Sequence, residues 1–158
     1  KGASSGMPLG IVLGSREIMD LPDIGSMSST HSANPLCCAA GKANLEALIE
    51  DHLIDNSFEL GQIFHEKLNI IMSQFPEHIK YVFGEGLLAG VIFQDKHGNP
   101  LTSLCDNISE MAFHRGLLVV HTGRESIKLA PPLSINKEAL IEGLNVFEEC
   151  IDDAVHGS

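Results

Sequence analysis

The 158-residue sequence has no tryptophan, a single tyrosine and only four cysteines. No apolar run approaches the roughly 20 residues that a membrane helix requires, so no membrane partner is predicted. Four cysteines, two of them adjacent, fit neither a dense disulfide framework nor a spaced zinc site, so we expect reduced thiols in a cytoplasmic protein. Glycine, serine and proline interrupt the first residues, which therefore do not form a signal peptide.

Positive charge is also scarce. Ten Lys and Arg face 21 Asp and Glu, which gives a net charge of −11 with His neutral. Nucleic acid and anionic membranes both repel so acidic a chain, and neither is an expected partner. Hydrophobic residues make up 44% and charged residues 20%, values typical of a globular chain.

The first half of the chain predicts a strand, a loop and two helices. A glycine-bounded apolar run predicts a buried strand over 8–14, and a Ser-, Gly- and Met-rich loop over 20–33 follows it. Asn34 and Pro35 are typical of a helix start, with the cap first and the proline at the first helical position. Apolar residues at spacings of three and four predict a second helix over 54–75.

From about residue 79 strands and helices alternate. The predicted elements are strands at 82–83, 87–93, 117–122 and 126–130 and helices at 103–115 and 137–155, the last capped by Asn136. The fold class is therefore α/β or α+β. We expect two parts, 1–78 and 79–158, of which the second contains enough strands to fold alone. The first has one strand for two helices, so we expect exposed apolar surface there.

Two patterns that suggest a ligand have simpler interpretations. Gly84, Gly86 and Ala89 match the dinucleotide pattern G-x-G-x-x-A, but a strand-like run follows them instead of a helix N-terminus, which favours a turn between strands. The eight histidines are scattered without an H-x-x-x-H pair, and adjacent Cys37 and Cys38 point to different sides of a helix. No metal site is predicted.

Three other places leave two interpretations open. Arg124 and Lys128 are expected on one face of a strand that ends in a Pro-Pro pair, where they either hold a carboxylate or form a solvated basic edge. Ser29 and Thr30 precede a helix and either donate to a phosphate or belong to an ordinary polar loop. Lys1 by itself does not indicate a catalytic role, because a nucleophilic lysine needs burial or a cationic neighbour to lower its pKa.

Four segments together resemble the class III pyridoxal-phosphate aminotransferases, the group of 4-aminobutyrate and ornithine aminotransferase. They are K-G-x-x-x-G-x-P-x-G-x-V-x-G at 1–14, S-T-x-x-x-N-P-x-x-x-A at 29–39, G-x-G-L-x-x-G at 84–90 and R-x-A-P-P-L at 128–133, the last with lysine for arginine. The four occur in the family's order over nearly the whole chain. The resemblance implies the C-terminal part of a fold type I enzyme, with 1–78 ending the large cofactor-binding domain and 79–158 forming the small α/β domain.

The resemblance also assigns the cofactor, pyridoxal 5′-phosphate, and its contacts. It implies that Lys1 forms the Schiff base with the cofactor and then moves a proton between the substrate carbon and the cofactor. It implies that Thr30, helped by Ser29, reaches the cofactor phosphate of the other subunit. A homodimer with shared active sites follows from that role.

The family arginine that grips the substrate carboxylate corresponds to Lys128. Because lysine is a point charge and lacks the planar fork, either Arg124 binds the carboxylate or the substrate is an ω-amine, an amino sugar or another amine without it. The family's acidic partner for the pyridinium nitrogen lies upstream of the lysine, so we predict that this chain alone is inactive.

The leading interpretation is a transaminase that exchanges an amino group between an amine or amino acid and a keto acid. The nearest alternative is an epimerase, aminomutase or decarboxylase of the same fold. A non-catalytic α/β interaction module, with Lys1 merely solvated, is the third.

Overall fold

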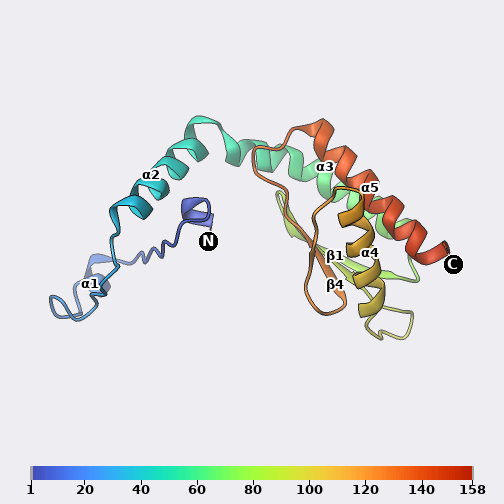
Figure 1. Ribbon diagram of the computed structural model, residues 1–158, viewed down its shortest axis with the longest axis horizontal. Helices are drawn as coiled ribbons and strands as arrows, with labels where there is room; N and C mark the ends of the chain where they lie inside the picture. Colours follow the sequence, from blue (N-terminus) through green and yellow to red (C-terminus); the bar gives the residue numbers. More distant parts are fainter. Residues whose placement is uncertain (1, 158) are drawn as a thin grey trace. The chain divides into compact units, whose positions relative to one another are not determined.

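The computed structural model describes residues 2–157, which form two compact units that divide between Leu53 and Ile54 (Figure 1). The first contains a short 3-10 helix, η1 (Gly2–Ser4), a four-residue helix, α1 (Arg16–Met19), and the long helix α2 (Pro35–Glu50). Lys1 and Ser158 lie outside the described residues.

Helix α2 begins where the sequence predicts. The Asn34 side chain accepts hydrogen bonds from the backbone N–H groups of Leu36 (3.0 Å) and Cys37 (3.3 Å), and Pro35 occupies the first turn. The cap therefore satisfies two of the N–H groups that a helix start leaves without intrahelical partners. Cys37 is buried and Cys38 is exposed, in agreement with the prediction that they point to different sides of the helix.

The strand predicted over 8–14 is wrong. This segment is extended without strand pairing, and Ile11, Val12 and Leu13 are exposed. A strand needs a neighbour to take its N–H and C=O groups, and the described part of the first unit contains no other strand. Instead the side chain of Leu9 lies against Gly41 of α2, where a Cβ would meet its Cδ2 at 2.5 Å.

The second unit is a four-stranded antiparallel sheet with three helices. Its elements are α3 (Leu53–Gln74), β1 (Ile79–Glu85), β2 (Leu88–Phe93), α4 (Thr102–His114), β3 (Val120–His121), β4 (Ser126–Leu129) and α5 (Lys137–His156). The strand order is β1-β2-β4-β3, so β2 and β4 are central. Val91 of β2 pairs with Val82 of β1 on one side and with Ile127 of β4 on the other.

One face of this sheet and the three helices form a single core. Its largest buried side chains come from every helix and from both central strands: Phe64, Leu68, Ile71, Val91, Phe93, Cys105, Ile108, Ile127, Phe147, Cys150 and Ile151. The other face leaves Tyr81, Phe83 and Leu88 exposed. No helix among residues 2–157 has the length and apolar character needed to cross a bilayer.

Helix α3 belongs to this second unit. Its periodic apolar residues Phe64, Leu68 and Ile71 are each 1% exposed in the core that they share with the sheet. The two compact units therefore divide at 53/54, at the start of α3. The assignment of 1–78 and 79–158 to the large and small domains of a longer enzyme stays a prediction.

The strand expected over 117–122 is reduced to Val120–His121. Helix α4 ends with Gly116 in the left-handed region (φ 83°), and the N–H of Leu117 donates to the carbonyl of Ala112 at 2.8 Å. This is the bond of a Schellman turn, which uses the donor that a strand at Leu117 would need. The other predicted helices and strands of this unit are confirmed within a few residues.

Candidate functional site

The sequence-predicted site residues fall into two groups. Ser29 and Thr30 lie in the first unit, and Arg124 and Lys128 lie in the second. Lys1, the expected catalytic lysine, lies outside the described residues. The structure therefore describes two partial sites, each within one unit.

The hydroxyls of Ser29 and Thr30 are exposed in the turn that leads into α2. The carbonyl of Ser29 accepts hydrogen bonds from the N–H (3.1 Å) and the hydroxyl (2.7 Å) of Ser32, which fixes the turn. Within residues 2–157 neither the Ser29 nor the Thr30 hydroxyl has a hydrogen-bond partner. Both are therefore available to donate to a ligand.

The N–H groups that follow are less available. Asn34 already accepts from Leu36 and Cys37, and Pro35 has no N–H. A phosphate at this turn would therefore bind the two hydroxyls first. The backbone N–H groups of Leu36 and Cys37 could donate to it only if the Asn34 cap opened. Two free hydroxyls before a helix N-terminus fit the phosphate of pyridoxal phosphate.

Lys128 lies in β4 on the uncovered face of the sheet. Its backbone pairs with Gly90 of β2 and Val120 of β3, and its side chain is exposed. The ring of Phe83 occupies the space above Gly90, since a Cβ there would lie 2.5 Å from the ring's Cζ. The neighbours of Lys128 on the adjacent strands, Gly90 and Val120, are therefore apolar.

Arg124 does not lie on the same strand, so the expectation that one strand carries both cations is wrong. It belongs to the turn between β3 and β4, next to Gly123, whose φ is 77°. Its side chain makes no ion pair with any residue of the described range. The turn reverses the chain at Gly123, which is why Arg124 precedes the strand.

The glycine motif is a turn between β1 and β2, as predicted. Gly84 (φ 136°) and Gly86 (φ 56°) both have positive φ. Gly86 packs against α3: a Cβ on Gly61 would lie 2.6 Å from the Cα of Gly86. The hydroxyl of Ser57 also accepts from the N–H of Leu87 at 3.2 Å. These glycines serve close packing of a helix on a turn.

Asn56 of α3 holds the segment after the Pro-Pro pair. Its amide donates to the carbonyls of Leu133 (2.6 Å) and Ile135 (3.1 Å). The first turns of α3 therefore contact two of the motif segments, through Asn56 and through Ser57. The sequence analysis did not identify either residue, because a polar residue early in a helix carries no signal of such a distant partner.

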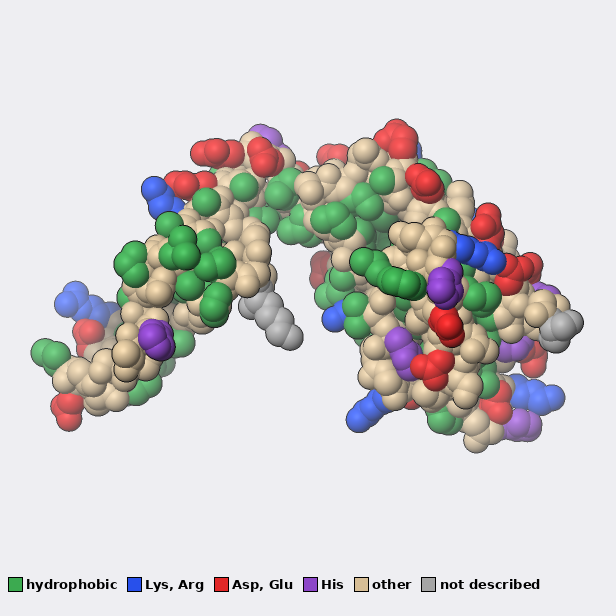
Figure 2. All heavy atoms as spheres, viewed as in Figure 1, with side chains coloured by type: hydrophobic (Ala, Val, Ile, Leu, Met, Phe, Trp, Pro, Cys, Tyr) green, Lys and Arg blue, Asp and Glu red, His purple; other side chains and the backbone are tan. Residues whose placement is uncertain are grey.

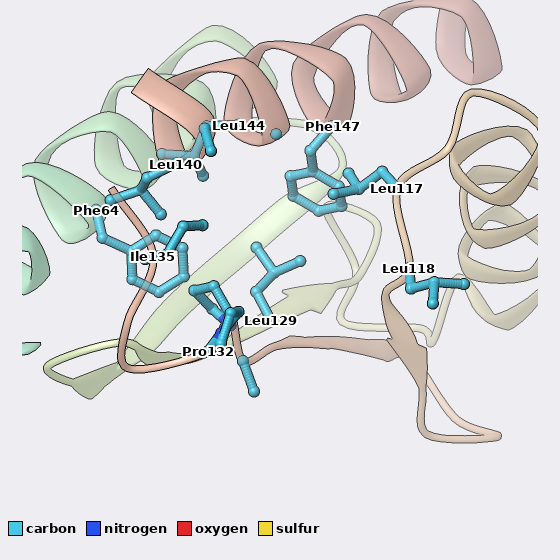
Figure 3. Close-up of a pocket in the computed structure, with 13 residues that line it drawn as sticks. Phe64, Leu117, Leu118, Leu129, Pro132, Ile135, Leu140, Leu144 and Phe147 are labelled. Atoms are coloured by element: carbon cyan, nitrogen blue, oxygen red, sulfur yellow. The ribbon is translucent and has the colours of Figure 1, made fainter. Parts of the chain in front are cut away.

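A cavity of about 310 Å³ opens beside this segment (Figure 3). Side chains of α3, α5 and β4 surround it, and those labelled in the figure are Phe64, Leu117, Leu118, Leu129, Pro132, Ile135, Leu140, Leu144 and Phe147. No charged side chain lines the cavity. It therefore offers nothing to hold a phosphate or a carboxylate.

Within residues 2–157 the structure shows neither a metal-binding cluster nor a reactive thiol at Cys105. Among residues 2–157 no group of three or more His, Cys, Asp and Glu could hold a metal ion. Burial raises the pKa of the Cys105 thiol to about 12, and the nearby Asp106 and Glu125 carboxylates add to the effect. A thiol that stays protonated is a poor nucleophile.

The two units differ in surface chemistry. Figure 2 shows apolar side chains gathered over α2, where Leu36, Leu45 and Ile49 are 68%, 48% and 72% exposed. Acidic side chains follow the exposed surface of α5. The apolar surface expected in the first part of the chain is thus present.

Known proteins match almost the whole chain. A sequence model of the family "Aminotransferase class-III" matches residues 1–151. The alanine/serine racemase of Pyrococcus horikoshii is 36% identical over 99% of the chain and 33% of its own length. The mitochondrial ornithine aminotransferase of Arabidopsis thaliana is 31% identical over 92% of the chain and 30% of its own length.

A solved aminotransferase structure also resembles this chain. The acetylornithine aminotransferase of Elizabethkingia anophelis superposes with a TM-score of 0.76 at 31% identity, over 85% of this chain and 32% of that one. The chain spans about a third of the length of the curated relatives that it matches.

Proposed function

Since the chain belongs to the class III aminotransferase family, we propose that it supplies part of the active site of a pyridoxal-phosphate-dependent transaminase, which exchanges an amino group between an amine or amino acid and a keto acid. The observation that carries the proposal is the match over residues 1–151, which includes all four motif segments in order. The structural likeness to an acetylornithine aminotransferase supports it.

Pyridoxal phosphate, when bound, supplies an aldehyde for an amine and a ring that withdraws electrons from the substrate carbon. In this proposal the side-chain amine of Lys1 holds the cofactor and then moves the proton at that carbon. An uncharged primary amine is needed because it can both form an imine and act as a general base. The hydroxyls of Thr30 and Ser29 bind the phosphate. Their exposed position and lack of other partners support this role.

Arg124 and Lys128 are the proposed carboxylate-binding residues. Arg124 offers a planar fork without a competing ion pair inside the described range, and Lys128 offers a point charge on the open sheet face. A carboxylate bound there would orient the substrate amine. Because a lysine holds a carboxylate less rigidly than an arginine, the proposal keeps amines without that carboxylate among the substrates.

A homodimer with shared sites and a cytoplasmic location belong to the same proposal. Thr30 would serve the partner's cofactor in such a dimer, and the exposed apolar residues of α2 offer a surface for association. The four cysteines at positions 37, 38, 105 and 150 are free, which is the usual state in a reducing compartment.

Borohydride trapping tests the role of Lys1. The chain is mixed with limiting pyridoxal phosphate and reduced, and the modified amine is mapped by peptide mass spectrometry with fragment spectra. Selective modification of the Lys1 side chain supports the proposal. Modification spread over the α-amine and the other lysines contradicts a formed site in this chain. Lys1→Ala is the matched control, because it keeps the α-amine and removes the side-chain amine.

Samples of the same chain that have not been reduced test the expected inactivity. With pyridoxal phosphate and an amino donor, this chain is expected to form no keto acid above background, since the acidic partner of the pyridinium nitrogen is not among its motif residues. Clear turnover would contradict this expectation.

A racemase of the same family is the second candidate function. The 36% identity to an alanine/serine racemase over 99% of the chain favours it. Product analysis separates the two in a longer protein that carries this chain. A racemase converts L-alanine to D-alanine without consuming a keto acid, whereas a transaminase forms pyruvate and requires an amino acceptor.

A further inference from the structure

His121 of β3 connects the turn that carries Arg124 to helix α4. Its Nδ1 lies 3.0 Å from Oδ1 of Asp106, and its Nε2 lies 3.0 Å from the backbone carbonyl oxygen of Arg124. The His121 side chain is 20% exposed, whereas that of Asp106 is 61% exposed. The imidazole is thus held between a helix and the turn, mostly out of water.

Both partners of this ring are acceptors. A carboxylate and a carbonyl oxygen offer no proton, so each ring nitrogen must donate for both contacts to be hydrogen bonds. Both distances, 3.0 Å, lie in the range of hydrogen bonds, so the ring links Asp106 of α4 to the backbone of the turn.

The rest of the turn is held at its two ends. The carbonyl of Glu125 accepts from the N–H of Phe93 at 2.7 Å, and the N–H of Thr122 donates to the carbonyl of Ser126 at 3.2 Å. Between these bonds, Gly123 supplies the positive φ that reverses the chain. The carbonyl of Arg124 has its contact from His121, so the imidazole fixes the peptide plane from which the Arg124 side chain leaves the turn.

We infer that His121 is a positioning residue, which fixes the turn between β3 and β4 through Asp106 and thereby sets the direction in which the Arg124 guanidinium points. The inference rests on the proposed function, in which Arg124 binds a carboxylate. Fixing the main chain matters there because a bidentate pair needs the guanidinium plane aligned with the carboxylate. A guanidinium on a loose turn loses that alignment.

The experiment uses the 158-residue chain and acetate as the carboxylate probe. Backbone amide signals and the Nε–H signal of the Arg124 guanidinium are followed by NMR, with sodium chloride at equal ionic strength as the blank. His121→Ala and Asp106→Ala are expected to lower the order parameters of residues 122–125 and to raise the acetate dissociation constant at Arg124 roughly five-fold, the effect of losing one hydrogen bond. Asp106→Asn keeps an oxygen acceptor and is expected to restore both.

His114→Ala is the matched control. His114 is also in the α4 region and faces a carboxylate, with Nε2 4.0 Å from Oε1 of Glu110, but both side chains are more than two-thirds exposed. Its removal is expected to leave the turn and acetate binding unchanged. Thermal unfolding of each variant separates a local effect from a general loss of stability.

Unchanged order parameters in His121→Ala would overturn the inference, and so would a loosened turn that binds acetate as tightly as before. A different result marks failure of the proposed function alone: the wild-type chain binds no acetate at Arg124, while His121→Ala still loosens the turn and Asp106→Asn restores it. In that case His121 fixes the turn, and Arg124 has no carboxylate role.

Discussion

Gly61 of α3 and Gly86 of the turn between β1 and β2 meet backbone to backbone: a Cβ on Gly61 would lie 2.6 Å from the Cα of Gly86 and 2.9 Å from its carbonyl carbon and oxygen. Atoms at such distances overlap, so a side chain at position 61 would move either the helix or the turn. The contact explains why position 61 has no room for a side chain, whereas a Cβ on Gly86 would lie 2.7 Å from Oγ of Ser57.

Gly61→Ala is expected to destabilise the second unit by about 2 kcal/mol, because overpacking against backbone forces the elements apart. Urea denaturation followed by circular dichroism measures this. Gly143→Ala on α5 is the control, since a Cβ there has only Leu117 Cδ1 within reach, at 3.4 Å. That change is expected to be neutral or to stabilise the helix by up to about 1 kcal/mol. Equal effects of the two changes would contradict the argument.

Asn56→Ala should cost about 1–2 kcal/mol, because it removes the donors for the carbonyls of Leu133 and Ile135. Asn56→Asp is the sharper test. It keeps the size of the side chain but offers only oxygens to two carbonyls, so it is expected to destabilise at least as much at neutral pH. An aspartate variant as stable as the wild type would show that these two bonds do not hold the segment.

Asn136→Ala is expected to cost about 1 kcal/mol through loss of the cap on α5. The Asn136 side chain accepts from the N–H of Ala139 at 2.8 Å. Asn136→Asp keeps an acceptor and should retain most of the stability. Asn145→Ala, an exposed change within the same helix, is the control and should have little effect. The comparison uses urea midpoints of the three variants.

Stability is expected to fall in alkaline solution because of Cys105. Its pKa is raised from 9.0 to about 12 in the folded chain. The unfolded chain therefore releases this proton at lower pH than the folded one, so the contribution is complete below about pH 9 and is lost as the pH rises toward about 12. Burial raises the pKa of Cys150 as well.

Urea midpoints measured from neutral pH up to about pH 10, within the range over which the two states differ, test this. Cys105→Ala should flatten the alkaline fall, whereas Cys38→Ala, which removes an exposed thiol, should not. An equally steep fall in Cys105→Ala would assign the effect to other groups. In the native chain, alkylation is expected at Cys38 first, since Cys37, Cys105 and Cys150 are buried.

Patterns among neighbouring residues were sufficient to predict most elements of the second unit and the residues at which the helices begin. Asn34 and Asn136 both cap the helices that they predict, because a cap depends on residues within one turn. Helix α3 follows from the spacing of Phe64, Leu68 and Ile71. The strand over 8–14 failed for the opposite reason: its apolar residues satisfy the local pattern, but a strand also needs a partner at a distance.

For the candidate site too, some residues follow from the sequence and others only from the structure. The motifs indicate Ser29, Thr30 and Lys128 as site residues and the charge pattern adds Arg124, and these assignments stay predictions. The motifs gave no sign of His121, Asn56 or Ser57, whose partners lie between 3 and 79 positions away. A hydrogen bond between a side chain and a backbone group of another element or turn leaves no periodicity, so the sequence cannot indicate it.

What this sequence determined by itself is the set of local elements, the caps, the turn glycines and the family, because each depends on residue types at fixed short spacings. Tertiary structure alone decided that α3 packs with the sheet, that Arg124 sits in a turn while Lys128 sits in a strand, and that His121 and Asn56 hold the segments beside them. These outcomes depend on which surfaces meet when the chain folds, and for α3 the burial of Phe64, Leu68 and Ile71 in the core shared with the sheet is the physical cause.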